Sequence, residues 1–178
     1  MSTSTTNTTG NTRTGPGSTV RPGLRTGEHF VAVQFAAWGP QEVTVRASSG
    51  GRGGAPYVVV QVGTCLTYAY DQAAVESHVT AWQDAEQINR SVRLPEFAPA
   101  SATRRHAGED LSVLCNVDAE QHHNVTSSTG ADGRPVITVT VGAVTVDVHT
   151  TTALRSYLAA WRKAATATGM LENARDEQ

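Results

Sequence analysis

The side chains best able to do chemistry in this 178-residue chain are six histidines and two cysteines. A metal site would draw on His122 or His123 together with His149, and on Asp147 or Cys115 as a further ligand. Neighbouring residues of a strand point to opposite faces, so His122 and His123 cannot serve one site in a regular strand. The CxxC and HExxH spacings that bind zinc are absent. The sequence therefore predicts neither a metal nor a cofactor.

Patterns for nucleophilic catalysis are missing as well. The chain has no GxSxG elbow, and no histidine is placed by pattern beside Cys65 or Cys115. Both cysteines lie in strand-like runs, where cysteine usually acts as a small buried hydrophobe. The glycine-rich stretch SGGRGGAP lacks the GxxxxGK[ST] pattern and precedes a strand pattern, so it predicts a hairpin loop. We therefore expect a protein that is not an enzyme.

Tyrosines and arginines remain as candidates for a binding surface. In YVVVQVGTCLTYAY, residues 57–70, the valines at 58, 60 and 62 share one face of a predicted hairpin, and the tyrosines lie on the other. Tyrosines on an open sheet can stack on bases or anchor a protein partner. Packing within the chain or in an oligomer would equally cover such a stripe. The candidate binding residues are Tyr57, Tyr68, Tyr70, Arg46, Arg52, Arg104 and Arg105.

Elements that position these residues follow from the apolar periodicity. Period-2 alternation predicts four strands in each half of the chain, and a stripe at helical spacing predicts a helix after each set. Asp71 is a typical N-cap for the first helix, and Gly169 is expected to end the second. The predicted strands are 29–38, 42–48, 57–62, 65–70, 110–118, 122–129, 136–141 and 144–149, and the predicted helices are 72–90 and 150–169.

An internal repeat is the strongest signal in the sequence. One offset of 79 residues aligns TAWQDA with AAWRKA, and it also aligns Pro56 with Pro135 and Gly63 with Gly142, without a gap. The repeat predicts an α+β fold made of an internally duplicated β-β-β-β-α unit. We expect antiparallel sheets, each covered on one face by the helix of its own unit. Trp82 and Trp161 then occupy the same core position in two copies.

The two predicted helices differ in charge. Glu76 of the first corresponds to Arg155 of the second, and Asp84 corresponds to Lys163. Opposite charges at equivalent positions could hold the units or subunits together, or both faces could simply be solvated, since exposed ion pairs contribute only ~0–1 kcal/mol.

Composition divides the chain into five segments. A Thr/Ser/Gly-rich tail is predicted to be disordered because it offers too little apolar surface to offset its ordering entropy. This tail contains three arginines and no acid, so its charge is +3 and the rest of the chain carries −5, for a total of −2. The negative charge of residues 28–178 disfavours general binding to phosphate backbones. The segments are the tail 1–27, the first repeat 28–90, a connector 91–108 pinned by Leu94 and Phe97, the second repeat 109–169 and a polar C-terminal tail 170–178.

Two further expectations concern the cell. No apolar run is long enough for a membrane span and no secretory signal is present, so the sequence predicts a cytoplasmic protein that does not bind a membrane. A single lysine against thirteen arginines, with abundant Ala, Thr, Val and Gly, is typical of a bacterium with a high-GC genome.

The order of the predicted elements is similar to that of the Whirly type of single-stranded nucleic-acid-binding fold, over residues 28–169. The resemblance is one of topology, because the lysine-rich motif of that family is absent. Two functions are therefore expected from the sequence. The first is an interaction or scaffold module that contacts a protein partner or itself through sheet faces. The alternative, which the resemblance implies, is binding of single-stranded nucleic acid.

Overall fold

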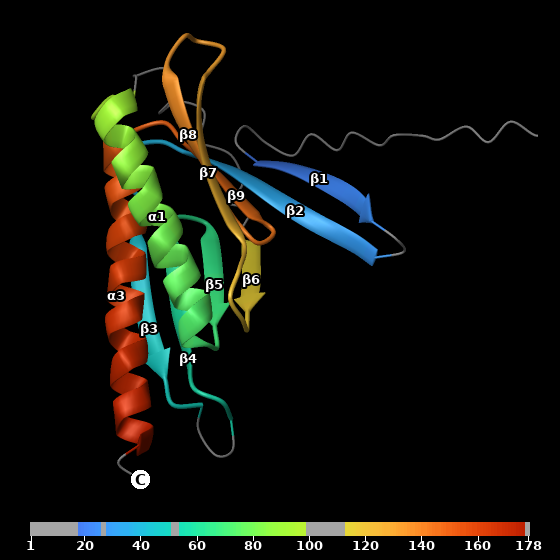
Figure 1. The fold of residues 1–178 in the computed structure, drawn as a ribbon, viewed down its shortest axis with the longest axis vertical. Helices are drawn as coiled ribbons and strands as arrows, with labels where there is room; N and C mark the ends of the chain where they lie inside the picture. Colours follow the sequence, from blue (N-terminus) through green and yellow to red (C-terminus); the bar gives the residue numbers. More distant parts are fainter. Residues whose placement is uncertain (1–17, 26–27, 51–53, 99–112, 177–178) are drawn as a thin grey trace, which may run out of the picture.

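The duplicated α+β fold is confirmed by the computed structural model, which describes residues 18–25, 28–50, 54–98 and 113–176 (Figure 1). Each unit contains four strands followed by a helix. The first comprises β2 (Glu28–Ala37), β3 (Val43–Ser48), β4 (Tyr57–Val62), β5 (Cys65–Ala69) and α1 (Gln72–Val92), and the second comprises β6 (Val113–Val117), β7 (His123–Thr129), β8 (Pro135–Val141), β9 (Val144–Val148) and α3 (Thr151–Asp176). A further strand, β1 (Ser18–Arg25), precedes them.

The two units exchange their first strands. The first sheet has the order β3-β4-β5-β6, and the second sheet has the order β1-β2-β9-β8-β7. β6 of the second unit thus joins the sheet of the first unit, parallel to β5, and β2 joins the other sheet, parallel to β9. The pairings within each unit are antiparallel, as expected, so each sheet is mixed.

The helices are exchanged as well. α1 packs chiefly on β7 and β8 of the second unit, whereas α3 packs on β3 and β4 of the first. Each sheet is covered on one face by a helix, as predicted, but the helix belongs to the other unit. The two helices also contact each other along one side of the sheets (Figure 1). Neither of these described helices is long and apolar enough to cross a membrane.

Matching hydrogen bonds join the two units at equivalent positions. The backbone N–H of Gln121 donates to Ser77 Oγ on α1 at 3.0 Å, and that of Gln41 donates to Ser156 Oγ on α3 at 3.1 Å. Ser77 and Ser156 are 79 residues apart, which is the offset of the repeat. Each bond joins a loop of one unit to the helix of the other, so the exchange is stabilised at equivalent points.

One continuous core lies between the sheets and the helices. It contains the inward valines of both central hairpins, such as Val60 and Val139, each 1% exposed. The inward stripes of the helices are confirmed, because Trp82 and Trp161 are 2% and 3% exposed. Since both sheets contribute to this core, neither unit has a complete core without the other.

The ends of the helices agree only in part with the sequence. Asp71 is the N-cap of α1 and accepts a hydrogen bond from the Ala73 N–H, as predicted. The predicted end of the second helix at Gly169 is wrong, since α3 continues to Asp176. Leu171 packs against the core beyond that glycine, and this contact outweighs the weak helix propensity of glycine, about 1 kcal/mol.

Residues outside the two repeats follow the sequence in part. Leu94 is buried, as expected of a residue that pins the connector, but the same expectation for Phe97 is wrong because its side chain is 73% exposed. Within the predicted tail, residues 18–25 form β1, whose pairing satisfies the backbone groups along one edge of β2. The rest of that tail, and residues 99–108 of the connector, lie outside the described residues.

We expect Gly142→Ala to lower the free energy of unfolding by about 1–2 kcal/mol. Gly142 turns the chain between β8 and β9 with φ +56°, and an added Cβ would lie 2.5 Å from Gln121 Oε1. Urea denaturation measures the change. Gly169→Ala is the control, because that glycine lies in α3 with open space around it and alanine there should stabilise the helix. Equal effects of the two substitutions would contradict the argument.

Candidate interaction surface

The face of the first sheet that points away from the helices carries the predicted tyrosines. Tyr57 and Val59 lie on β4, Leu66 and Tyr68 on β5, and Tyr70 directly follows β5. The antiparallel register places Val59 opposite Tyr68. The ring of Tyr57 lies 5.7 Å from the ring of Tyr68 and 5.7 Å from that of Tyr70, so the three tyrosines form one cluster.

Leu114 extends this cluster onto the exchanged strand. β6 pairs with β5 so that Leu114 is opposite Leu66, on the same side of the sheet. Periodicity places Leu114 outward, but no local signal reveals that β6 joins β5, so sequence reasoning missed this residue. We call Tyr57, Val59, Leu66, Tyr68, Tyr70 and Leu114 together the aromatic face.

The aromatic face is open to solvent in the described structure. Leu114 is 57% exposed and Tyr70 is 41% exposed, while the side chains between them are half-buried. Both helices lie on the other side of the first sheet (Figure 1). An apolar patch of this kind on a monomer normally marks an interaction site.

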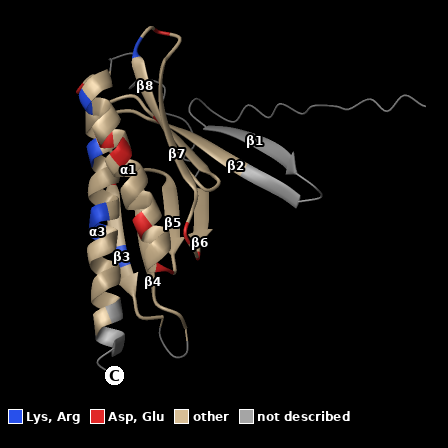
Figure 2. Cartoon of the chain, viewed as in Figure 1, with Lys and Arg blue, Asp and Glu red and all other residues tan. Residues whose placement is uncertain are grey.

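The strands that carry the aromatic face have no charged residues, although the exposed Asp71 and Asp118 lie directly after Tyr70 and β6. Figure 2 shows no charged residue on β4, β5 or β6, whereas charges are frequent on the helices. Arg46 on β3 is exposed and stands opposite Val59, which places it on the same face of the sheet. The other candidate arginines, Arg52, Arg104 and Arg105, lie outside the described residues.

The equivalent face of the second sheet is polar and internally hydrogen-bonded. Asp147 stands at the position of Tyr68, and it accepts hydrogen bonds from Thr138 Oγ1 at 2.7 Å and from Gln34 Nε2. Nearby, the imidazole ring of His149 stacks on Trp38 at 3.9 Å, and burial lowers the pKa of His149. Because these polar groups already hydrogen-bond to one another, burying this face against another molecule would gain less free energy than burying the aromatic face.

Four aromatic side chains meet between the helices and the sheets. His78 of α1 stacks on Trp161 of α3 at 3.8 Å, and Trp82 of α1 stacks on Tyr157 of α3 at 4.3 Å. The sequence predicts His78 to be a packing residue at the place of Tyr157, and its 6% exposure agrees with that interpretation. Burial lowers the pKa of His78 to about 3 and raises the pKa of Tyr157. We call these four residues the aromatic quartet.

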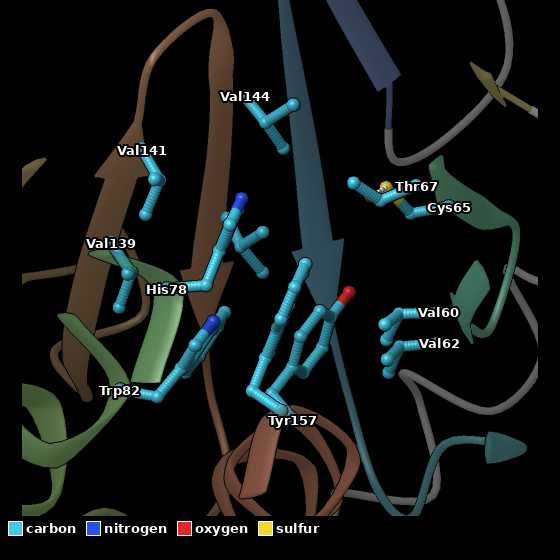
Figure 3. Close-up of a pocket in the computed structure, with 12 residues that line it drawn as sticks. Val60, Val62, Cys65, Thr67, His78, Trp82, Val139, Val141, Val144 and Tyr157 are labelled. Carbon is cyan, nitrogen blue, oxygen red and sulfur yellow. Dashed lines mark hydrogen bonds between the residues drawn. The ribbon is translucent and has the colours of Figure 1, made fainter. Parts of the chain in front are cut away.

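A small cavity adjoins the aromatic quartet. His78, Trp82 and Tyr157 lie between the valines of the two sheets (Figure 3), and the cavity they line has a volume of about 20 Å³. Such a space holds about one water molecule and no organic ligand. The quartet is therefore a packing arrangement of the core.

A larger, open groove of about 650 Å³ lies between α1 and β7. Asp84 and His123 meet in it with 3.4 Å between the carboxylate oxygen and Nε2, and both side chains are partly exposed. Ser91 also lines the groove, but its hydroxyl donates to the Ile88 carbonyl. The described residues contain no group of three or more His, Cys, Asp or Glu side chains that could hold a metal ion.

The charge difference between the helices has a limited structural role. An exposed ion pair joins Arg162 of α3 to Glu86 of α1 at 3.4 Å, so one contact between the helices is electrostatic. Asp84 pairs with His123 on β7 instead. Exposed pairs of this kind contribute ~0–1 kcal/mol, so the packing of the aromatic quartet dominates the helix contact.

Comparison with protein-family models, curated proteins and solved structures finds no significant match to this chain. Its function is therefore inferred from its own residues.

Proposed function

We propose that this protein is a non-enzymatic interaction module that self-associates through the aromatic face of its first sheet. The observation that carries the proposal is the contrast between the two outward faces, one of which is apolar and open while the other is polar and internally bonded. Burying a hydrogen-bonded polar face gains little, whereas burying an apolar one contributes about 25 cal/mol per Å².

A second copy of the chain is the partner that fits best. In a two-fold dimer the same patch contacts itself, so the patch must lack charges that would repel across the axis. The aromatic face itself contains no charged residue, and its charged neighbours are Arg46 on β3 and, at the other end, the exposed Asp71 and Asp118 that follow Tyr70 and β6. Clustered tyrosines are also side chains that interfaces favour.

The size of the face predicts a weak dimer. The aromatic face spans three strands, β4, β5 and β6, and strands spaced ~4.8 Å apart and about six residues long at ~3.3 Å each give it a footprint of roughly 14 by 20 Å. This footprint is smaller than the ~800 Å² per partner of a standard interface, so association should depend on concentration.

We expect the full chain to sediment as a monomer at low micromolar concentration and increasingly as a dimer at hundreds of micromolar. Leu114→Asp should abolish the dimer, because it buries an unpaired charge in the interface. Leu114 is 57% exposed, so the monomer should tolerate the change. Sedimentation velocity measures both proteins.

Ser128→Asp is the matched control. Ser128 is exposed on β7 of the second sheet, so the variant adds the same charge to a surface outside the proposed interface and should dimerise like the wild type. Tyr68→Ser/Tyr70→Ser is a second test at the centre of the tyrosine cluster. A wild type that stays monomeric throughout, or equal loss in Ser128→Asp, overturns the proposal.

Single-stranded nucleic acid is the second candidate partner. It is favoured by the tyrosine cluster, whose rings could stack on bases, together with the exposed Arg46 on the same sheet face. The −5 charge of the chain after Gly27 argues against it. A labelled oligonucleotide distinguishes the two, because binding at low salt that Tyr68→Ser/Tyr70→Ser abolishes would favour this candidate, and no binding at low salt would end it.

A further inference from the structure

The outer edge of β7 carries backbone groups that bond to no other strand of the described structure. β7 stands at the end of the second sheet, and β8 is its one strand partner there. Just before β7, the His122 carbonyl accepts a hydrogen bond from the Gly142 N–H at 3.0 Å. Just after β7, the Gly130 N–H donates to the Arg134 carbonyl at 2.7 Å. Both bonds are made on the β8 side, and both belong to even-numbered residues of this segment.

These two bonds fix the direction of the backbone groups between them. In an antiparallel pair, residues that bond to the partner strand alternate with residues whose N–H and C=O groups point the other way. The even-numbered residues, such as Asn124, therefore bond to β8. The N–H and C=O groups of His123, Val125 and Ser127 point to the outer edge, where a further strand could pair with them.

The open groove between α1 and β7 lies along this edge. Three consecutive residues of β7, 123–125, line it. Successive side chains of a strand point to opposite faces, so a groove that touches all three lies at the edge of the sheet. Its volume of about 650 Å³ is within the ~300–1,000 Å³ of ligand pockets. A peptide in this groove would meet the outward backbone groups of His123 and Val125.

The side chains of α1 in the groove favour a basic peptide. The Asp84 carboxylate is half exposed, while Ile88 and Val125 supply apolar surface beside it. Asp84 and Ile88 are separated by ~6.0 Å of helix rise, close to the ~6.6 Å between same-face residues of a strand. An extended segment with a cationic side chain two residues from an apolar one therefore matches the groove. The −5 charge of residues 28–178 also favours a basic partner.

The equivalent place in the other unit differs in charge. The Gly63 N–H donates to the Glu42 carbonyl as Gly142 does to His122, so Val43 of β3 corresponds to His123. Val43 packs against the core, and Lys163 of α3 stands at the position of Asp84. A lysine there would repel a cationic side chain, so the preference for a basic segment belongs to the groove between α1 and β7.

We propose that this groove binds an extended, basic peptide segment of another protein, which joins the outer edge of β7 as an additional strand. The peptide backbone bonds to the N–H and C=O groups of His123 and Val125, and its cationic side chain pairs with Asp84. In strand addition of this kind, main-chain hydrogen bonds supply affinity and the alternate side chains supply specificity. The site lies on the second sheet and is separate from the aromatic face.

The test uses the fluorescein-labelled peptide SVTRTVS with blocked ends, whose valines and arginine share one face of a strand. Fluorescence anisotropy at low salt should show saturable binding to the full chain, and replacing the peptide's arginine by glutamate should weaken it at least tenfold. Amide hydrogen exchange then locates the peptide. The N–H groups of His123 and Val125 should exchange rapidly in the free protein and slowly with peptide, whereas Asn124 should exchange slowly in both.

Asp84→Asn should weaken binding by about two- to fivefold, as expected for the loss of an exposed ion pair. Glu76→Gln is the matched control, because it removes the same charge from an exposed position of α1 outside the groove and should bind like the wild type. Circular dichroism verifies that both variants fold. No saturable binding, equal loss in the two variants, or binding without protection of His123 and Val125 overturns the proposal.

Discussion

Trp82→Ala is expected to lower the free energy of unfolding by about 3–5 kcal/mol. Trp82 is 2% exposed, and its ring stacks on Tyr157 of the exchanged helix at 4.3 Å. Removing the ring leaves a cavity where both helices and both sheets meet, and the rigid strands on either side cannot close it fully. The loss should therefore lie at the upper end of what single core substitutions cause.

Urea denaturation followed by circular dichroism measures this effect. Trp161→Ala should be similarly destabilising, since Trp161 occupies the equivalent position and is 3% exposed. The control is Trp38→Ala, because Trp38 is half-buried just after the end of β2, where it stacks on His149. If Trp82→Ala and Trp38→Ala had equal effects, the aromatic quartet would not be the centre of the core.

His78 should make the fold sensitive to acid. Its ordinary pKa of 6.5 falls to about 3 in the folded protein, because burial disfavours the charged ring. Below pH 6.5 the unfolded chain binds a proton at His78 that the folded chain does not. The free energy of unfolding therefore falls with decreasing pH by about 1.4 kcal/mol per unit, until the pH reaches about 3.

His78→Phe is the variant that tests this linkage. Phenylalanine can stack on Trp161 as the imidazole does, and Tyr157 at the equivalent position indicates that a larger ring is compatible with such a stack. Between pH 6.5 and pH 4.5 the wild type should lose about 2–3 kcal/mol more than this variant. His122→Phe, at an exposed position, should keep the wild-type pH dependence. Identical profiles for wild type and His78→Phe would refute a neutral, buried His78.

Much of the architecture is already determined by the sequence. The offset of 79 residues predicts two equivalent units, and the stripe that includes Trp82 and Trp161 predicts the inward faces of both helices. Asp71 predicts the start of α1. The repeat is visible by direct comparison of two segments of the sequence, and the other features depend on residues close together along the chain, whose spacing reflects the period of a strand or a helix. The parity of residues 57–70 likewise places Tyr57, Tyr68 and Tyr70 on one face.

Only the tertiary structure decides which segments pair. β6 could have joined either sheet by its periodicity, and its parallel pairing with β5 brings Leu114 to the tyrosines. The exchange of α1 and α3 places His78 against Trp161. Such pairings arise from hydrophobic contacts between residues far apart in the sequence. These contacts leave no periodic pattern along the chain that would show which segments pair. The sequence by itself thus determines the units and their inward faces, whereas their exchange, which completes the aromatic face, depends on the assembled core.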